Sequence, residues 1–499
     1  MLQRLATLSA VLALAACGPQ TEIQGPHATP DGNLRYGALT FKPCSLSVAR
    51  LSAVEAQCAT LAVPENHDQP QGRSIELAIA LVIGDGPAAP DPIVMLAGGP
   101  GQSALESYPA LHDAFDDARR NRSVLLMDAR GTGRSHPLKC EDAGRSAASE
   151  VNDISPQAAR EFAERCRDAL ARDSDLRYYT TDDHIRDLDL VRAKLGIEQL
   201  NLVGVSYGTR VAQQYAKRYP QHTRTVTLDS VAPNSLVLGQ EHARNLDAAL
   251  KLQFARCVQD AACARNLGDP GAKLETLRVR LRAGNLAAVR YRDPISAEWR
   301  SEAPTYGHLG LLLRLYAYQP QASSMLPLIV HDASEGHFES LLAQARSVYA
   351  SVSDSIMQGM QLSVICSEDT ELVADPGDAG TLLGSEFAEF ARAECEVWPK
   401  RERAADFRAP LAGEVPVLAI SGELDPVTPP RYGDEVIKSL PNGRHLILPG
   451  QGHNVIGIGC MPKLFAQFIE SASAKSLDAE CLSRLSPTPP FAGNYGWEP

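Results

Sequence analysis

Short, uninterrupted apolar runs recur along this chain and are separated by segments with helical periodicity. Runs of this kind are typical of strands that are buried on both faces of a parallel sheet. Between two of them, residues 182–195 place their apolar side chains largely on one helical face, and residues 209–218 are expected to form another helix. The expected strands are 74–83, 92–96, 123–127, 200–205, 224–228, 415–420 and 444–448. Strands that alternate with helices predict an α/β fold with a doubly wound, mostly parallel sheet.

The pattern changes between residues 234 and 409, where helical segments dominate and no convincing sheet strand occurs. This stretch separates the strands 224–228 and 415–420, so it is an insertion into the sheet topology. We expect it to form a mainly helical cap domain over the C-terminal edge of the sheet. A chain of 499 residues is long enough for two domains. The sheet domain then consists of residues 41–233 and 410–499.

Composition narrows the classes of partner. The chain is 44% hydrophobic and 22% charged, as in water-soluble globular proteins, and its formal net charge is −12. Nucleic-acid binding is not expected, because phosphate contacts need clustered Lys and Arg side chains. Beyond the first twenty residues, no apolar run reaches the roughly 18 residues that a membrane-spanning helix requires. The oligomeric state is left open by the sequence.

The N-terminus has the pattern of an export signal. One Arg precedes the apolar run 5–16, which is followed by Cys17. The residues that end in Cys17 resemble the bacterial lipobox, in which this Cys carries the lipid. Residues 1–17 are then a lipoprotein signal peptide, and the Gly- and Pro-containing residues 18–40 are a tether. Gly18, in place of Asp, favours the outer membrane or its periplasmic face, with only the lipid in contact with the membrane. The alternative is an ordinary signal peptide and a periplasmic or secreted protein.

The cysteine count agrees with export. Of eleven Cys residues, ten remain when Cys17 is set aside, and disulfides persist in exported proteins. Sequence alone leaves their connectivity open, but we expect neighbours along the chain to pair, because each pair would close a local loop. The expected pairs are Cys44 with Cys58, Cys140 with Cys166, Cys257 with Cys263, Cys366 with Cys395 and Cys460 with Cys481. The chain has no CxxC, HExxH or Cys/His cluster, so neither a metal nor an organic cofactor is expected.

Gly204-Val205-Ser206-Tyr207-Gly208 is the most informative local motif. It follows an expected strand and precedes an expected helix, which is the context of a G-x-S-x-G nucleophile elbow. The glycines allow a sharp turn that lifts the Ser206 hydroxyl above the sheet. The N-terminus of the helix that follows adds a positive dipole next to the hydroxyl. Ser206 is therefore the candidate nucleophile.

A serine hydroxyl needs an adjacent base, and the base needs an orienting acid. In folds that carry such a nucleophile elbow, the acid and then the base follow the serine along the chain. Asp425 comes after the strand 415–420, and His453 comes after the strand 444–448, so both emerge at the same sheet edge as Ser206. The alternative is that Asp425 merely caps a turn and that His453 is an ordinary loop residue. Asp229, at the end of the strand 224–228, is the alternative acid.

Two backbone N–H groups are expected to form an oxyanion hole. One is that of Tyr207, directly after the nucleophile, and the second should follow an early strand. Ala97-Gly98-Gly99-Pro100-Gly101 lies there, and its glycines let the backbone approach a substrate closely. We assign the second donor to the N–H of Gly99; the alternative is a Gly-rich turn without function.

Several stretches resemble the tripeptidyl-aminopeptidase and proline-iminopeptidase group of serine α/β-hydrolases. The matching stretches are Gly98–Gly101, Asp128–Ser135, Gly204–Thr209, Gly422–Pro430 and Gly452–His453. They occur in the family's order and cover about residues 40–490. The resemblance implies the α/β-hydrolase fold and peptidase activity. Ala97 stands where the iminopeptidases commonly have His, which favours the tripeptidyl-type branch over strict proline specificity.

Aminopeptidases of this family hold the substrate's free amine with acidic residues of the cap. The best match here is Glu368 with Asp369, beside Cys366, and the alternative is a solvated acidic loop. The resemblance thus implies an aminopeptidase that releases short N-terminal peptides or residues through an acyl-enzyme. One alternative is a carboxylesterase or lactone hydrolase with the same triad, which takes small esters. Another is a catalytically inactive surface binding protein.

Overall fold

The computed structural model describes residues 25–496, apart from 49–50, 88, 141–154, 354, 370, 372–377, 379 and 494–495. In this part of the chain the main sheet has eleven strands in the order β1-β2-β3-β4-β5-β7-β6-β8-β9-β12-β13. They are β1 His27–Ala28, β2 Leu34–Tyr36, β3 Leu39–Leu46, β4 Val54–Pro64, β5 Ser74–Val82, β6 Ile93–Leu96, β7 Val124–Met127, β8 Leu200–Val205, β9 Thr223–Asp229, β12 Val417–Gly422 and β13 Gly443–Leu448. From β7 through β13 all neighbouring strands are parallel. The predicted α/β class and sheet are confirmed, and an antiparallel arm from β1 to β5 is added to them.

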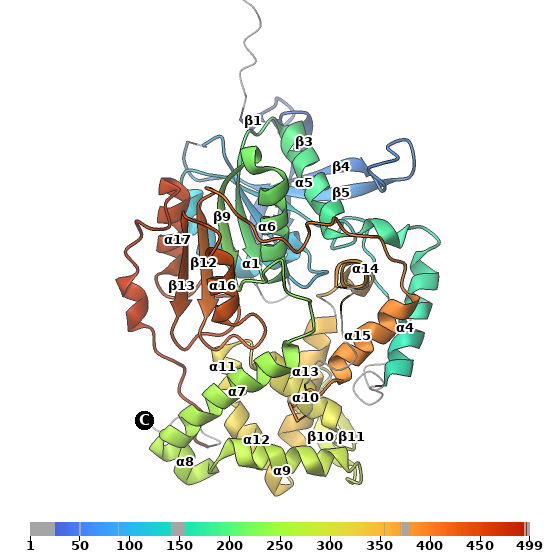
Figure 1. The fold of residues 1–499 in the computed structure, drawn as a ribbon, viewed down its shortest axis with the longest axis vertical. Helices are drawn as coiled ribbons and strands as arrows, with labels where there is room; N and C mark the ends of the chain where they lie inside the picture. The colour runs from blue at the N-terminus through green and yellow to red at the C-terminus, as the bar shows by residue number, and fades with distance from the viewer. Residues whose placement is uncertain are drawn as a thin grey trace, which may run out of the picture.

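Helices cover both faces of the parallel strands (Figure 1). On one face pack α1 (Ala104–Leu111), α2 (Asp116–Arg119) and α17 (Met461–Ser471). On the other pack α5 (Thr181–Leu195), α6 (Tyr207–Arg218) and α16 (Pro430–Ile437), whereas α4 (Pro156–Leu170) lies beside the helix Glu386–Val397. Successive side chains of a strand point to opposite faces. In β12, accordingly, Val417 and Ala419 belong to one core, and Leu418 and Ile420 belong to the other. This explains why the parallel strands are apolar without interruption.

Most of the inserted segment forms a separate body at one end of the sheet, with its own apolar core (Figure 1). The helices of this body are α7 His242–Gln259, α8 Ala261–Leu267, α9 Pro270–Arg282, α10 Tyr306–Tyr316, α11 Pro320–Ser323, α12 Leu326–Glu335 and α13 Glu339–Ser353. The last two helices of the segment, α14 Gln358–Glu368 and α15 Glu386–Val397, pack instead into the core of the sheet domain. The separate body also contains a hairpin of β10 (Val289–Arg292) and β11 (Trp299–Glu302), which the sequence did not lead us to expect. The hairpin is a two-stranded sheet of its own, and Tyr291 on its inner face is buried.

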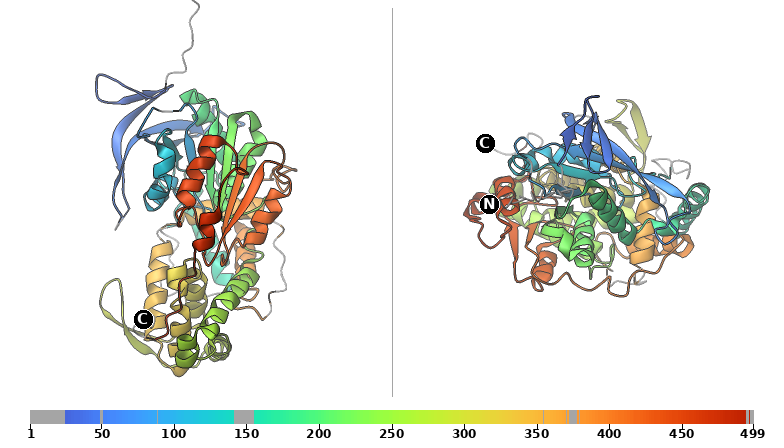
Figure 2. Two further views of the ribbon diagram at one scale, coloured as in Figure 1. Left: turned by 90° about the vertical axis from the view of Figure 1, so that its left-hand side faces the viewer. Right: turned by 90° about the horizontal axis from the view of Figure 1, so that it is seen from above.

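The expected tether 18–40 is wrong from His27 onward. Residues 27–28 and 34–36 form β1 and β2, and β3 begins at Leu39. Tyr36 and Leu39 are buried in the core, so this segment belongs to the folded body. Figure 2 shows β1 to β4 extending from the sheet at the end opposite the cap. The predicted signal peptide with Cys17 lies outside the described residues.

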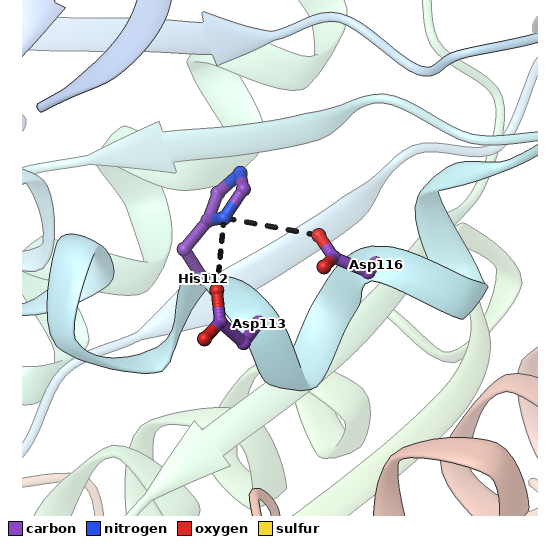
Figure 3. Close-up of side chains that lie close together, drawn as sticks. All are labelled: His112, Asp113 and Asp116. Carbon is purple, nitrogen blue, oxygen red and sulfur yellow. Dashed lines mark ion pairs between the residues drawn. The ribbon is translucent and has the colours of Figure 1, made fainter. Parts of the chain in front are cut away.

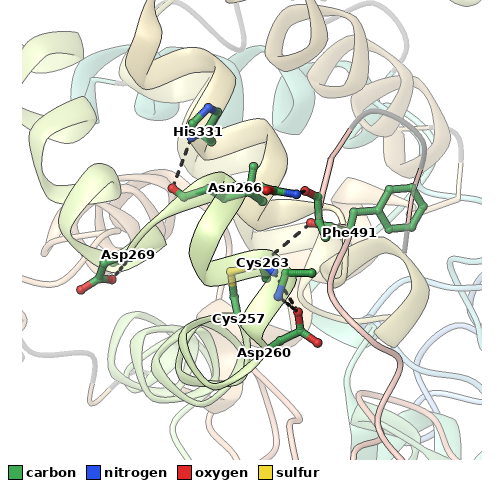
Figure 4. The surroundings of a disulfide bond; sticks show 11 residues. Cys257, Asp260, Cys263, Asn266, Asp269, His331 and Phe491 are labelled. Atoms are coloured by element: carbon green, nitrogen blue, oxygen red, sulfur yellow. Dashed lines mark hydrogen bonds between the residues drawn. A yellow bond between two sulfur atoms is a disulfide. The ribbon is translucent and has the colours of Figure 1, made fainter. Parts of the chain in front are cut away.

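All five expected disulfides are present, and each joins neighbours along the chain. Cys257–Cys263 links the end of α7 to α8 and closes a loop of six residues (Figure 4). The C-terminal segment passes close to this bond, where the Asn266 side chain donates a hydrogen bond to the carbonyl of Ala492 (2.9 Å). No helix in the described part of the chain is long and apolar enough to cross a membrane.

Candidate active site

Ser206 occupies a strained turn between β8 and α6. Its backbone has φ 55° and ψ −122°, a conformation that a non-glycine residue rarely adopts. The turn is tight, because a Cβ on Gly208 would collide with the carbonyl oxygen of Leu96, and one on Gly204 would collide with that of Gly208. The Ser206 N–H is anchored by donation to the carbonyl of Asp229 (2.8 Å). The side chain is thus held at the start of α6, and Ser206 is partly exposed.

Asp425 and His453 meet at the ends of β12 and β13. The Nδ1 atom of His453 lies 2.7 Å from Oδ2 of Asp425, and both side chains are buried. Asp425 also accepts hydrogen bonds from the backbone N–H groups of Val427 (2.9 Å) and Thr428 (2.8 Å) and from the Thr428 hydroxyl (2.8 Å). These bonds fix the carboxylate, which in turn orients the imidazole so that its Nε2 is left for other chemistry.

The two groups stabilise each other's charged form. Burial alone would raise the pKa of Asp425, but the His453 charge and the hydrogen bonds outweigh it and lower that pKa. Burial alone would lower the pKa of His453, yet the nearby Asp425 raises it above its ordinary value, with a smaller contribution from Asp229. The arrangement suits a base that must carry a proton during a reaction.

Asp229, the alternative acid, has a different place. Its carboxylate accepts the backbone N–H groups of Val455 (2.9 and 3.0 Å) and Ile456 (3.0 Å), which follow His453 in the same loop. Burial raises the pKa of Asp229 to about 6, against the effect of these hydrogen bonds. Asp229 therefore fixes the backbone of the loop that carries His453, whereas Asp425 contacts the imidazole ring.

The glycine-rich loop lies against the nucleophile. A Cβ on Gly98 would be 3.1 Å from the Cβ of Ser206, closer than such atoms normally approach. Gly99 and Gly101 have φ angles of 104° and 105°, which only glycine adopts readily. After the loop, Ser103 caps α1 by accepting the N–H of Glu106 (3.0 Å). The loop thus lies directly against the start of α6, and the oxyanion hole assigned to Gly99 and Tyr207 stays a prediction.

Asp128 fixes the end of this loop by hydrogen bonds, a role that sequence analysis missed. It is fully buried and accepts the Ser103 hydroxyl (2.6 Å) and the N–H groups of Leu105 (3.0 Å) and Arg134 (3.0 Å). Asp128 begins the Asp128–Ser135 stretch, which was noted only as a family resemblance. Through the hydrogen bonds of Asp128, this stretch at the end of β7 is linked to the N-terminus of α1.

Comparison with known proteins places this geometry in a family. The model of the alpha/beta hydrolase fold family matches residues 91–458. The chain belongs to this family. It is 25% identical over 474 residues to a serine protease, Hip1, of Mycobacterium tuberculosis, covering 85% of this chain and 87% of that protein. It is 30% identical over 248 residues to a tripeptidyl aminopeptidase of Streptomyces coelicolor, covering 46% of this chain and 45% of that enzyme.

A crystal structure of proline iminopeptidase from Mycobacterium smegmatis matches 82% of this α/β-hydrolase and 97% of its own chain, at 17% identity and a TM-score of 0.35. The family model and the relatives named serine protease and tripeptidyl aminopeptidase make the chain a serine hydrolase, and the resemblance found in the sequence is confirmed.

The cap of this α/β-hydrolase reaches the histidine through Tyr318, just after α10. The carbonyl oxygen of Tyr318 accepts the His453 N–H (2.8 Å), and the two rings lie edge to face with centroids 5.0 Å apart. The Gln319 side chain donates to the carbonyl of His453 (3.3 Å). Nothing in the sequence around Tyr318 singles it out, because the contact depends on how the cap docks.

Glu368 and Asp369, the predicted amine-binding pair, are buried and bound by the chain's own donors. Glu368 accepts the Thr181 N–H (2.6 Å) and hydroxyl (2.8 Å). Burial raises the pKa of Glu368 to about 7, although Arg210 and the Thr181 hydrogen bonds act in the opposite direction. Asp369 forms ion pairs with Arg210 (3.0 Å) and Arg408 (2.8 Å). Neither carboxylate is presented as an open receptor for an ammonium group.

One group of possible metal ligands occurs among the described residues, formed by His112, Asp113 and Asp116 (Figure 3). His112 Nδ1 lies 3.6 Å from Asp113 and 3.7 Å from Asp116, and both carboxylates are largely exposed. Arg119 also pairs with Asp116 (3.4 Å). The group lies at the turn after α1, and its charges are balanced by these neighbours.

Proposed function

We propose that this serine hydrolase is an aminopeptidase that releases short N-terminal peptides or single residues through an acyl-enzyme. Ser206 is the nucleophile, His453 the general base and acid, and Asp425 the orienting acid. The observation that carries this assignment is the 2.7 Å contact between His453 Nδ1 and Asp425 Oδ2, on loops beside the Ser206 turn. No metal or organic cofactor takes part in the proposed reaction.

In the proposed mechanism, Ser206 Oγ attacks the scissile carbonyl carbon while His453 Nε2 takes the hydroxyl proton. The carbonyl oxygen becomes an oxyanion and is held by the N–H groups of Gly99 and Tyr207, assisted by the N-terminal dipole of α6. When the C–N bond breaks, the imidazolium donates its proton to the leaving amine. A water molecule, activated by His453, then hydrolyses the ester bond to Ser206 by the same steps.

The peptide substrate is supported by the relatives named serine protease and tripeptidyl aminopeptidase. A cap that contacts the histidine loop at Tyr318 also suits substrates with a short, accessible end. A carboxylesterase acting on small esters is the second candidate. It is favoured by one observation, namely that the carboxylates of Glu368 and Asp369 are already engaged within the protein. If the substrate has a free amine, a group other than Glu368 and Asp369 must bind it, or these carboxylates must first leave their present partners.

Matched chromogenic substrates separate the two candidates. Protein without residues 1–17 is assayed with free-amine mono-, di- and tripeptide anilides, with their N-acetylated forms and with a p-nitrophenyl ester; Ser206→Ala is the blank. An aminopeptidase hydrolyses the free-amine peptides and loses this activity on acetylation. Turnover of esters alone, or indifference to acetylation, identifies an esterase. Labelling by a fluorophosphonate probe that is absent in Ser206→Ala excludes an inactive binding protein.

We further propose that the protein is exported and anchored by a lipid on Cys17. Five disulfides support an oxidising compartment, since such bonds persist outside the cytoplasm. Expression in a bacterium supplied with an alkyne-bearing fatty acid tests this proposal. The wild-type protein should incorporate the label and fractionate with membranes, whereas Cys17→Ala should do neither.

A further inference from the structure

We propose that helix α14 holds the two segments of the oxyanion hole in register, and that Glu368 is a positioning residue that acts on Tyr207 through Thr181. The inference rests on the proposed function, because it takes Gly99 and Tyr207 as the sources of the two N–H donors. It gives Glu368 a role in the reaction that does not require contact with the substrate.

The N-terminal end of α14 contacts the glycine-rich loop. The Met357 N–H, one residue before the helix, donates to the carbonyl of Gly101 (2.9 Å). The approach is close, because a Cβ on Gly101 would be 2.8 Å from the carbonyl oxygen of Met357. One turn further, Met360 is fully buried and lines a small pocket together with Gly98, Gly101 and Tyr207. The helix therefore lies beside both oxyanion segments.

The C-terminal end of α14 contacts the side chain of Tyr207. The carboxylate of Glu368 accepts both the N–H (2.6 Å) and the hydroxyl (2.8 Å) of Thr181. The Thr181 Oγ1 lies 2.6 Å from the Tyr207 hydroxyl. Since the Thr181 proton is given to Glu368, the Tyr207 hydroxyl donates to Thr181. All three side chains are nine-tenths buried or more, so the relay is shielded from water.

Two further contacts bind this end of the helix to its surroundings. Asp369, directly after α14, pairs with Arg210, which lies one turn after Tyr207 on α6 (3.0 Å). Cys366 is joined by a disulfide to Cys395 on α15. The last turn of α14 is thus connected to α5, α6 and α15. A short helix fixed at both ends is a stiff spacer, about 16 Å long at 1.5 Å per residue.

Stiffness matters here because an oxyanion donor acts only at the correct distance. Removing one such donor lowers kcat by about 100- to 1000-fold in serine hydrolases, and small misplacements of reacting groups are also costly. The Tyr207 N–H is part of the first turn of α6, and its ring and hydroxyl fix the rotation of that turn. A loss of the Glu368 contact would release the ring while leaving every triad residue in place.

The test compares Glu368→Ala with Glu65→Ala, a matched control. Glu65 is also buried and also accepts one backbone N–H, from Asp175 (2.8 Å), and one hydroxyl, from Tyr179 (2.9 Å). The Glu65 carboxylate also pairs with Arg73 (3.4 Å), and none of these three partners belongs to the oxyanion segments. Each variant is assayed with a free-amine peptide anilide and with the p-nitrophenyl ester, and its melting temperature is measured.

We expect Glu368→Ala to lower kcat by about 10- to 100-fold on both substrates with little change in KM, and Glu65→Ala to stay within about 3-fold of the wild type. Tyr207→Phe should also lower kcat, and adding it to Glu368→Ala should cost no more than Glu368→Ala alone, because both act through one hydroxyl. Glu368→Gln should recover most of the loss, since an amide can accept the Thr181 N–H and donate to the Thr181 hydroxyl.

Other outcomes overturn the inference. A raised KM for the free-amine substrate alone would make Glu368 an amine receptor. An equal loss in Glu65→Ala, or additive losses in the double variant, would reduce Glu368 to a contribution to stability. If Glu368→Ala does not fold, Tyr207→Phe and Glu368→Gln still decide the matter. Failure of the proposed function is distinct, because the wild-type protein would then leave the free-amine anilide intact, whereas the effect of Glu368→Ala would still be measured on the ester.

Discussion

At the scale of single residues, the two aspartates beside His453 are assigned by their partners. Asp425 contacts the imidazole at Nδ1, whereas Asp229 accepts N–H groups of Val455 and Ile456. We expect Asp425→Asn to lower kcat by about 1000- to 10,000-fold, because an amide stabilises the wrong tautomer and does not stabilise the imidazolium. Asp229→Asn should retain far more activity and mainly lower the melting temperature. Steady-state kinetics and thermal unfolding of both variants check this, and a larger loss of activity in Asp229→Asn would reverse the assignment.

The raised pKa of His453 also predicts a pH dependence. The base must be neutral to accept the Ser206 proton, so kcat/KM should rise with pH through the His453 pKa, with a midpoint above the ordinary value of about 6.5. The nearby Asp425 is responsible for the rise, against the opposing effect of burial. In Asp425→Asn the residual activity should therefore have its acid limb at lower pH. A pH profile with an ester substrate measures both midpoints, and an unchanged midpoint would show that Asp425 is not the dominant charge.

At the scale of elements, the elbow between β8 and α6 depends on a close approach of backbones. Gly208 lies where a Cβ would collide with the carbonyl oxygen of Leu96 in β6. We expect Gly208→Ala to destabilise the fold by at least about 3 kcal/mol and to abolish activity, because the start of α6 and the strand β6 would have to move apart. Gly310→Ala is the control. Gly310 lies within helix α10, and a Cβ added there would be 3.6 Å from the Leu383 side chain, which is an ordinary contact. Ala also favours helices by about 1 kcal/mol over Gly. Thermal unfolding of both variants tests this, and similar stabilities would contradict the steric account.

The elements that sequence analysis found and those it missed differ in their physical pattern. Strands buried on both faces, such as β8 and β12, have no exposed positions, so a continuous apolar run marks them. The strand β4 mixes buried, partly buried and exposed positions and includes Gln57 and Thr60, so it has no such run. The hairpin β10–β11 has exposed charges on one face and was hidden among helices for the same reason.

The candidate site follows the same logic. Ser206, Asp425 and His453 each follow an apolar strand, so their order and position along the chain were enough to predict that they lie at one edge of the sheet. Thr181 and Tyr318 were not predictable, because they reach the site only through the docking of α14 and of the cap. The carboxylate of Glu368 was found, but its burial and its partner Thr181 were not, and its predicted pairing with a substrate amine stays a prediction.

At the scale of the whole molecule, the C-terminal segment ties the cap to the sheet domain. After the last core helix it passes Gly450 in the histidine loop, where a Cβ would lie 2.5 Å from Pro487. It then reaches the cap, where the Phe491 N–H donates to the carbonyl of Ser324 (2.9 Å) and Asn266 donates to that of Ala492 (2.9 Å). Figure 4 shows this approach beside the Cys257–Cys263 bond. One segment therefore contacts both the loop that holds the base and the helices that cover it.

A chain that ends at Leu485 lacks this connection, and its cap should open more often. Two hydrogen bonds of about 1 kcal/mol each correspond to a rise of 10-fold or more in the open population. We expect faster amide hydrogen exchange in α8 and α11 and better turnover of longer peptides, because the cap would be held less firmly against the histidine loop at Tyr318. Asn266→Ala, which removes one of the two bonds, should lie between the wild type and the truncated chain. Unchanged exchange in the truncated chain would mean that the apolar interface alone holds the cap, and the segment would then have no part in substrate selection.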